Sequence, residues 1–292
     1  MAIDVVEIYA GTAPELLLSD AGIDSDFVQV KDVQGLDPVK ADISTQALAS
    51  TDGEQFTGGH LPNRNIVLTL RPNPDWVTHT YDSLREIVYK YFIPKALVNL
   101  IFHVGPDNTM IEIFGYVENI TDNHFSKEPE YIVSIICPDP FFTAQDPVEY
   151  SGSNILPEDF DTGKTIVTVN GNVPIGFFTK ITWVDGDLPS ILYIQVGNQV
   201  LSYFALKSGI GAEDEPGFDL GDSVLLEVDS VPLRKFVRNV NIDPATIVNK
   251  LSAIQPGSSW PVLQPGVNDF AVMSDTGTQN WTIKFFEQYG GL

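Results

Sequence analysis

The chain has 292 residues, of which 16 are Lys or Arg and 39 are Asp or Glu, so its formal net charge is −23. Proteins that hold nucleic acids or anionic membranes do so through clustered Lys and Arg, and this charge balance argues against both classes. The hydrophobic fraction is 43% and the charged fraction only 19%, which favours packed cores over disorder. At about 100–200 residues per domain, the length predicts two domains.

Nothing in the sequence indicates export or membrane insertion. The first residues include Asp4 and Glu7 and no basic start, unlike a signal peptide. No apolar run reaches the roughly 18 residues of a membrane span. Cys137 is the single cysteine, so no intrachain disulfide can form, and its apolar surroundings predict a buried thiol. We therefore expect a protein made in a reducing cytoplasm.

The first half of the chain is dominated by short segments with the composition and alternation of strands. Ile66, Leu68 and Leu70 would share one face of their strand. A turn at 105–108, rich in Gly, Pro, Asp and Asn, predicts a hairpin between the strands on either side of it. The predicted strands are Val5–Tyr9, Phe27–Val33, Asn65–Leu70, Leu97–Val104, Met110–Val117 and Tyr131–Cys137.

One stretch has a helical period instead. Its apolar residues recur at spacings of four and three, which predicts a helix over about 74–92 whose apolar stripe covers a sheet. Asn73 is the predicted N-cap, Pro74 suits the first turn and Pro94 ends the helix. The stripe consists of Val77, Tyr81, Leu84, Val88 and Tyr91.

Pro- and Gly-rich residues between Pro138 and Asn154 predict a domain boundary, which gives domains at 1–147 and 148–292. The second half contains many short strands at regular spacing, as a β-sandwich does, and Pro244–Leu251 predicts one or two helical turns capped by Asp243. The fold class is therefore mainly β with one or two helices. The predicted strands of this half are Thr165–Val169, Phe177–Val184, Ile191–Val196, Leu201–Ala205, Ser223–Val228, Lys235–Val240, Asp269–Ser274 and Trp281–Phe286.

No group of residues carries a recognisable chemistry. The acidic loops at 20–26 and 213–215 could collect calcium, but they lack the spacing of a calcium-binding loop and read as solvated surface. The four histidines are scattered, and neither a nucleophile elbow nor a phosphate-binding loop occurs. We expect no catalytic residue, no metal site and no cofactor, and hence a protein that binds or assembles. A pair of the many carboxylates acting as a glycosidase remains a third-ranked alternative.

Several short motifs, each weak alone, follow one another in a familiar order. Their order and spacing along nearly the whole chain resemble the siphophage distal tail (Dit) proteins. The motifs are Gly35–Pro38, Asp52–Phe56, Pro62–Leu68, Cys137–Phe142, Asn170–Pro174, Phe218–Asp222 and Ser259–Asn268.

This resemblance implies a structural component of a virion tail tip, in a phage or a related gene transfer agent. In that family the first domain is a β-sandwich or barrel-like domain that forms a ring, usually a hexamer, between the tail tube protein and the tail-tip hub. The second is a galectin-like β-sandwich that approaches receptor-binding proteins. No specific nucleic-acid binding is implied, although genome DNA passes through the ring.

Acidic residues of the first domain would suit the wall of such a lumen, because they repel DNA. Residues 1–150 hold 23 acidic and 8 basic side chains, a net charge of −15. Simple surface solubility is the competing explanation for each acid. The candidate lumen residues are Asp32, Asp37, Asp42, Asp52 and Glu54.

A carbohydrate-binding β-sandwich used in host attachment is the second-ranked reading. It would require exposed aromatic side chains in the second domain. Trp183, Trp260 and Trp281 lie in strand-like or Pro-rich contexts, and we expect them to be core or turn anchors instead.

Overall fold

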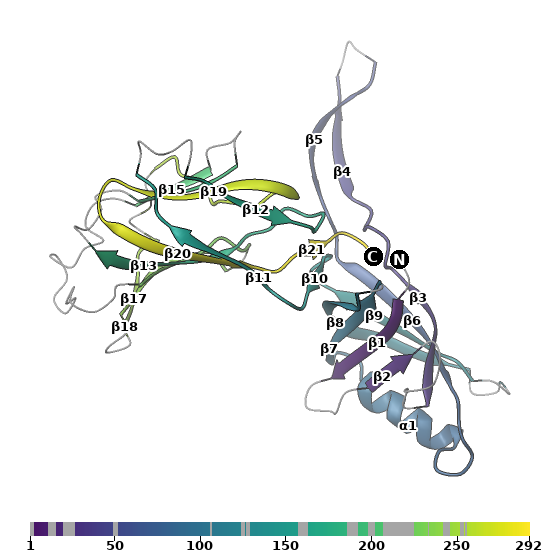
Figure 1. The fold of residues 1–292 in the computed structure, drawn as a ribbon. Coiled ribbons are helices and arrows are strands. Elements are labelled where there is room, and N and C mark those ends of the chain that lie inside the picture. The colour runs from purple at the N-terminus through teal and green to yellow at the C-terminus, as the bar shows by residue number, and fades with distance from the viewer. Residues whose placement is uncertain are drawn as a thin grey trace. The chain divides into compact units, whose positions relative to one another are not determined.

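The computed structural model describes residues 3–10, 16–19, 27–48, 52–105, 107–123, 126, 129–156, 163–185, 192–197, 202–206, 225–232, 234–241, 246–251, 254 and 256–292. These residues form strands with one α-helix (Figure 1), which confirms the predicted mainly β class. The chain divides into two compact units. The first contains Met1–Gln145 and the last four residues, Tyr289–Leu292, and the second contains Asp146–Gln288.

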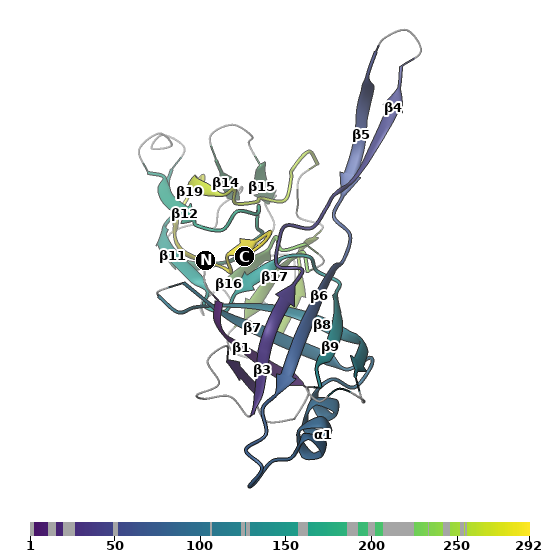
Figure 2. The ribbon, with the colours of Figure 1, turned by 90° about the vertical axis from the view of Figure 1, so that its right-hand side faces the viewer.

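Seven strands of the first unit close into a barrel. The pairing order runs β8, β7, β1, β2, β3, β6, β9 and returns to β8 through the β8–β9 pairing (Figure 2). All pairings are antiparallel except that of β2 with β3. The strands are β1 Ile3–Ala10, β2 Leu16–Ser19, β3 Val28–Gln34, β6 Arg64–Pro72, β7 Leu97–Val104, β8 Thr109–Asp122 and β9 Tyr131–Cys137; β10 Phe142–Ala144 and β21 Gln288–Tyr289 extend the sheet beyond β8.

Strand β8 changes partners part-way along its length. Its first half pairs with β7, as the predicted hairpin requires, and its second half pairs with β9. Gly115 lies just before this change. A Cβ atom there would stand 2.5 Å from Cγ2 of Ile135 and 2.8 Å from Sγ of Cys137, so only glycine fits.

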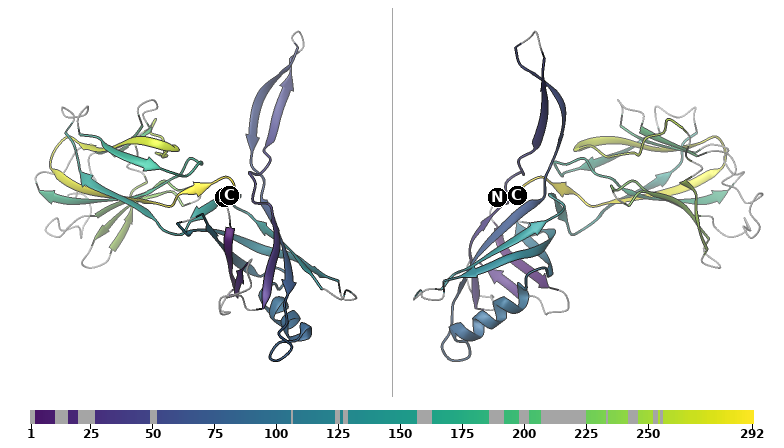
Figure 3. Two further views of the ribbon diagram at one scale, coloured as in Figure 1. Left: turned by 45° about the vertical axis from the view of Figure 1, so that its right-hand side comes forward. Right: turned by 180° about the vertical axis from the view of Figure 1, so that it is seen from behind.

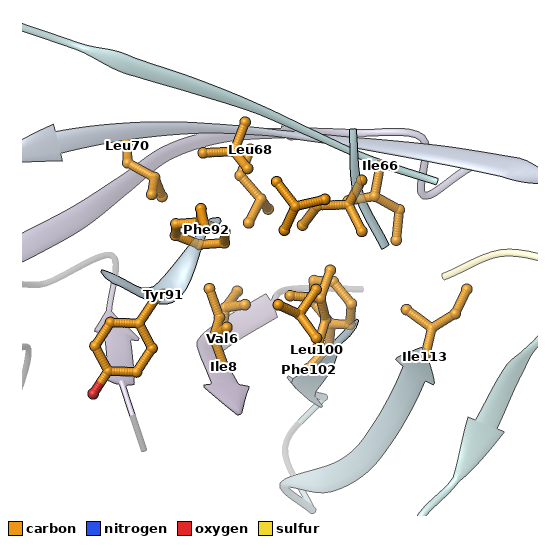
Figure 4. Packing of buried hydrophobic residues seen from close by; sticks show 14 of the residues in the cluster. Val6, Ile8, Ile66, Leu68, Leu70, Tyr91, Phe92, Leu100, Phe102 and Ile113 are labelled. Carbon is orange, nitrogen blue, oxygen red and sulfur yellow. The ribbon is translucent and has the colours of Figure 1, made fainter. Parts of the chain in front are cut away.

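Alternation along β6 explains the core of the barrel. Ile66, Leu68 and Leu70 are fully buried, while Val67 and Thr69 on the other face are not, as the sequence predicts. Figure 4 shows the three side chains pointing toward Val6, Ile8, Leu100 and Phe102 from the opposite wall, with Phe92 between them. Burying each such side chain contributes about 1.5–3 kcal/mol.

The helix α1 is shorter than predicted and spans Tyr81–Tyr91. Its N-cap is Thr80, whose hydroxyl accepts from the N–H of Ser83 while the Ser83 hydroxyl accepts from the N–H of Thr80. Leu84, Val88 and Tyr91 are buried as expected. The predicted start at Asn73 and Pro74 is therefore wrong.

The residues before α1 form a turn because of Asp75. Its carboxylate accepts hydrogen bonds from the N–H groups of Val77, Thr78 and His79, at 2.8 to 3.0 Å. These bonds compete with helix formation, as an Asp side chain near its own backbone can do. The Thr78 hydroxyl also donates to this carboxylate, and that bond, followed by the backbone bonds, lowers the pKa of Asp75. Val77, predicted to lie in the apolar stripe, is instead 88% exposed.

The second unit is a sandwich of two antiparallel sheets. One has the order β11-β20-β13-β16-β17-β18 and the other β12-β19-β14-β15. Phe177, Phe270 and Trp281 meet in the core between them. The strands are β11 Val148–Ser153, β12 Thr165–Val169, β13 Phe178–Asp185, β14 Leu192–Val196, β15 Ser202–Leu206, β16 Leu225–Asp229, β17 Phe236–Asn241, β18 Thr246–Asn249, β19 Gly266–Ser274 and β20 Thr278–Phe285.

The helix predicted at Pro244–Leu251 is wrong in its described part. Thr246–Asn249 is strand β18, which pairs with β17 along four residues. Thr246, Ile247 and Val248 are β-branched, which favours a strand. Asp243 and Pro244 lie outside the described residues. No helix in the described part of the chain has the length and apolar content that a membrane crossing requires.

Replacing Gly115 by Ala should destabilise the barrel, because the added methyl group overlaps Ile135 and Cys137. We expect the free energy of unfolding to fall by about 1–3 kcal/mol, measured by urea denaturation. Gly58→Ala is the matched control, since a Cβ there meets no atom within 4 Å. Equal stability of the two variants would contradict the tight packing at the β8 bend.

The start of α1 can be tested by comparing two alanine substitutions. Thr80→Ala removes the observed cap and should destabilise the helix by about 0.5–2 kcal/mol. Asn73→Ala, at the sequence-predicted cap, should change stability much less. Hydrogen exchange of the first helical turn measures both effects, and the reverse ranking would place the helix start at Asn73.

Candidate assembly surface

A two-stranded hairpin of the first unit stands apart from the barrel. Strands β4 Asp42–Ala47 and β5 Glu54–His60 pair with each other and, within the described residues, with no other strand. Figures 1 and 3 show the hairpin extending away from the barrel of its own unit.

Of the residues in β4 and β5, Gly58 alone is partly covered, and all the others, Thr57 included, are exposed. A hairpin of two strands is at best marginally stable in water without a third strand or a packed face. The hairpin is therefore a candidate surface for contact with another molecule, which would supply the missing packed face.

The hairpin has two chemically different faces. Pairing places Ile43 opposite Gly59 and Thr45 opposite Phe56, so Ile43 and Phe56 share one face, and each is 65% exposed. On the other face, Asp42 lies opposite His60, with 3.6 Å between the carboxylate Oδ2 and the imidazole Nε2. We call these the apolar face and the polar face of the hairpin.

Three of the acids predicted to line a lumen lie on this hairpin. Asp42 is on its polar face, and Asp52 precedes β5 near the tip. Glu54 begins β5 opposite Ala47, on the same face as Ile43, and accepts a hydrogen bond from Thr45. Asp37 lies in the segment that leads into the hairpin. Asp32 lies apart from them on β3, where it accepts from Nε2 of Gln34 at 3.0 Å. Their orientation toward a lumen stays a prediction.

Arg64, at the start of β6, holds the root of the hairpin. Its side chain is buried, with 2% exposure, and it donates hydrogen bonds to four main-chain carbonyl oxygens. The acceptors are Gly35 at 2.5 Å, Asp37 at 2.7 Å, Pro140 at 2.7 Å and Gly290 at 2.5 Å.

The guanidinium of Arg64 also lies over the ring of Phe142, 4.4 Å from its centroid. Burial lowers the pKa of Arg64 from its ordinary value, while the nearby Cys137 and Asp37 oppose that shift. The guanidinium therefore joins four segments that are far apart in the sequence: the hairpin root, β6, the loop after β9 and the residues that follow the second unit.

A second apolar surface lies on the outer wall of the barrel. Leu97 on β7 is directly opposite Tyr116 on β8, and Phe114 is two residues along the same face. Leu97 and Tyr116 are each 48% exposed, and Phe114 is 50% exposed. We call them the β7–β8 patch. Exposed apolar side chains that cluster in this way mark interaction sites more often than scattered ones do.

The other candidate features do not form a reactive site. Cys137 is buried, as predicted, and desolvation raises the pKa of its thiol to about 12, so it is not a nucleophile. Trp281 is buried in the second core, where its indole N–H donates to the carbonyl of Ser153 at 2.9 Å, and Trp260 packs partly buried against that core. Trp183 is also partly buried.

Among the described residues, no group of three or more His, Cys, Asp or Glu side chains could hold a metal ion. The acidic loops at 20–26 and 213–215 lie outside the described residues.

Sequence reasoning missed the hairpin and Arg64. No strand was predicted for β4 or β5, because neither has a buried face, although Ile43, Thr45 and Ala47 do alternate with polar residues. A single Arg next to a predicted strand gave no signal of burial, since Arg is usually exposed.

Comparison with known proteins matches part of the chain to one family and its whole length to a known fold. Residues 18–135 match the sequence model of the phage tail protein RIFT-related domain. The crystal structure of the Dit protein (gp 19.1) of phage SPP1, described as a paradigm of the hub adsorption apparatus in phages that infect Gram-positive bacteria, covers 98% of this chain and 99% of its own. The two are 16% identical, with a TM-score of 0.62.

Two structures of the phage p2 baseplate in its activated conformation, with Ca and with Sr, match more distantly. Their TM-scores are 0.42 and 0.40 at 9% and 8% identity, and they cover 97% and 96% of this chain and 98% and 97% of their own. Comparison with curated proteins gives no match.

The resemblance found in the sequence is thus confirmed at the level of the domain and of the fold. Residues 18–135 match the phage tail protein RIFT-related domain, and the chain as a whole has the fold of the SPP1 Dit protein.

Proposed function

We propose that this chain is the distal tail protein of its particle and forms a ring, six-fold as in the family it resembles, between the tail tube protein and the tail-tip hub. The observation that carries this proposal is the hairpin, which exposes Ile43 and Phe56 on a two-stranded sheet with no packed face of its own. In a ring, a neighbouring copy covers that face.

Two different apolar surfaces on one chain support a ring rather than a two-fold dimer. The apolar face of the hairpin and the β7–β8 patch are separate parts of the first unit, and the hairpin extends away from its own barrel (Figure 3). A contact between the hairpin of one copy and the wall of the next is heterologous. Repeated with rotation, such a contact closes into a ring.

The two units take different roles in this proposal. The first unit, 1–147 in the sequence-based division, forms the ring. The second, 148–292, is a galectin-like β-sandwich on the outside that approaches receptor-binding proteins. Support for the division comes from the two separate cores, one inside the barrel and one between the sheets of the sandwich.

The polar face of the hairpin suits the lumen. If the apolar face packs on a neighbour, Asp42 lies on the opposite face and Asp52 adds charge near the tip, whereas Glu54, opposite Ala47, lies on the apolar side. A negatively charged wall repels the DNA backbone, so genome DNA passes without being held. Surface solubility is the competing explanation for these acids.

Ring formation should depend on the apolar face. The unchanged chain should form rings, seen by mass photometry and negative-stain microscopy. Ile43→Ser combined with Phe56→Ser should give monomers, because the hydrated serine side chains remove the apolar surface that a neighbouring copy would bury. Gln55→Ser, on the polar face, is the matched control and should still form rings. A chain that stays monomeric at high concentration would contradict the proposal.

Neutralising the lumen acids should leave the ring intact but make it retain DNA. We expect the variant Asp42→Asn, Asp52→Asn to bind a double-stranded probe at low salt at least about twofold more than the parent, with the difference disappearing at high salt. Two neutralised acids of the second unit, Glu149 and Asp185, provide the control. Equal retention by both variants would assign the hairpin acids to solubility.

A further inference from the structure

We propose that Gly290, Gly291 and Leu292 form a clamp that sets the direction of the hairpin, so that ring assembly waits for a segment made after the whole second unit. This inference rests on the proposed ring. It concerns residues of the first unit alone, because the division of the chain places Tyr289–Leu292 there.

Two hydrogen bonds join the clamp to the hairpin root. The N–H of Leu292 donates to the carbonyl of Leu36 at 3.0 Å. The carbonyl of Gly290 accepts from Nη2 of Arg64 at 2.5 Å, while Nη1 of the same guanidinium holds the carbonyls of Gly35 and Asp37. One buried cation thus binds the clamp and the root together.

Close packing adds to these bonds. A Cβ atom on Gly291 would lie 2.7 Å from Cδ of Pro38 and 2.9 Å from the carbonyl oxygen of Leu36, so the clamp backbone lies directly against the root backbone. Leu36, Tyr289 and Leu292 are partly buried against the barrel core. Any side chain at 291 would push the two backbones apart.

Few other contacts restrain the outer part of the root. Gly35 lies against the backbone of Asn65 and Leu36 is partly buried, but Asp37, Pro38 and Lys40 are exposed. The hairpin beyond them pairs with no further strand among the described residues. Without the carbonyl of Gly290, Arg64 keeps a buried donor with one fewer acceptor, which is unfavourable. The root is then held by fewer contacts and the hairpin can change direction.

The order of synthesis determines when the clamp can form. Residues 290–292 follow the second unit, so at about 5–20 residues per second the root stays incomplete for on the order of ten seconds after β9 is made. During that time the hairpin is not held in the direction that a ring needs. Neighbouring nascent chains are thereby kept from joining through their hairpins before the second unit has folded.

Spin labels on the full-length chain test the clamp directly. Gln55→Cys on the hairpin and Thr69→Cys on β6 supply the two labels, and the native Cys137 is buried with its thiol protonated, so it stays unlabelled. In the parent we expect one narrow distance distribution. Adding Gly291→Val should broaden it at least about twofold and reduce the fraction of rings, with unchanged circular dichroism.

A second pair of variants isolates the hydrogen bond. Leu292→Ala and Leu292→Pro both remove the leucine side chain, but only proline removes the N–H that bonds Leu36. The proline variant should broaden the distribution more than the alanine variant does, and this pair decides the matter if Gly291→Val fails to fold.

Two results would overturn the clamp: an unchanged distance distribution in Gly291→Val, or equal distributions in the two Leu292 variants. Neither depends on rings, because the distances are measured on labelled chains diluted with unlabelled ones and also on unassembled protein. Absence of rings in the parent would instead contradict the proposed function. The distance measurement would still test the clamp, since it does not require rings.

Discussion

The buried guanidinium of Arg64 is the interaction on which the first unit depends. Moving a cation out of water is unfavourable, and here it is offset by four carbonyl oxygens and the face of Phe142. Leaving a buried donor without its acceptor typically destabilises a protein by about 1–3 kcal/mol, and by more when the donor is charged. Because carbonyl oxygens belong to the backbone, the cation fixes the course of the chain itself at the place where the hairpin leaves the barrel.

Closure of the barrel makes that place important. Among the described residues, the closed order of strands gives each barrel strand a partner on both sides, and β10 and β21 continue the sheet from β8. The hairpin is separate from this sheet: among the described residues its two strands pair only with each other, and Ile43 and Phe56 are exposed on its apolar face. In the proposed ring, this hairpin and the β7–β8 patch make the contacts between copies, and the direction of the hairpin depends on the contacts around Arg64.

Much of the fold could be predicted from the sequence because buried faces leave periodic patterns. Ile66, Leu68 and Leu70 are buried and alternate with the partly covered Val67 and Thr69, and that pattern correctly located β6. The start of α1 could not be predicted, since Asn73 followed by Pro74 resembles a cap and only the folded turn shows that Asp75 holds the backbone away from a helix. β18 was mistaken for a helix because four residues are too few to show a period.

The candidate surface was harder to predict than the fold, because only buried faces leave periodic patterns in a sequence. A strand without a buried face has no pattern imposed on it, so Asp42–Ala47 and Glu54–His60 were noticed only for their acids. Three of those acids, Asp42, Asp52 and Glu54, lie on the hairpin, where their positions follow from a pairing register that no single residue reveals, and their orientation toward a lumen stays a prediction. In an assembling protein the surface that matters is completed by another molecule, and a single chain's sequence therefore records its core more clearly than its interface.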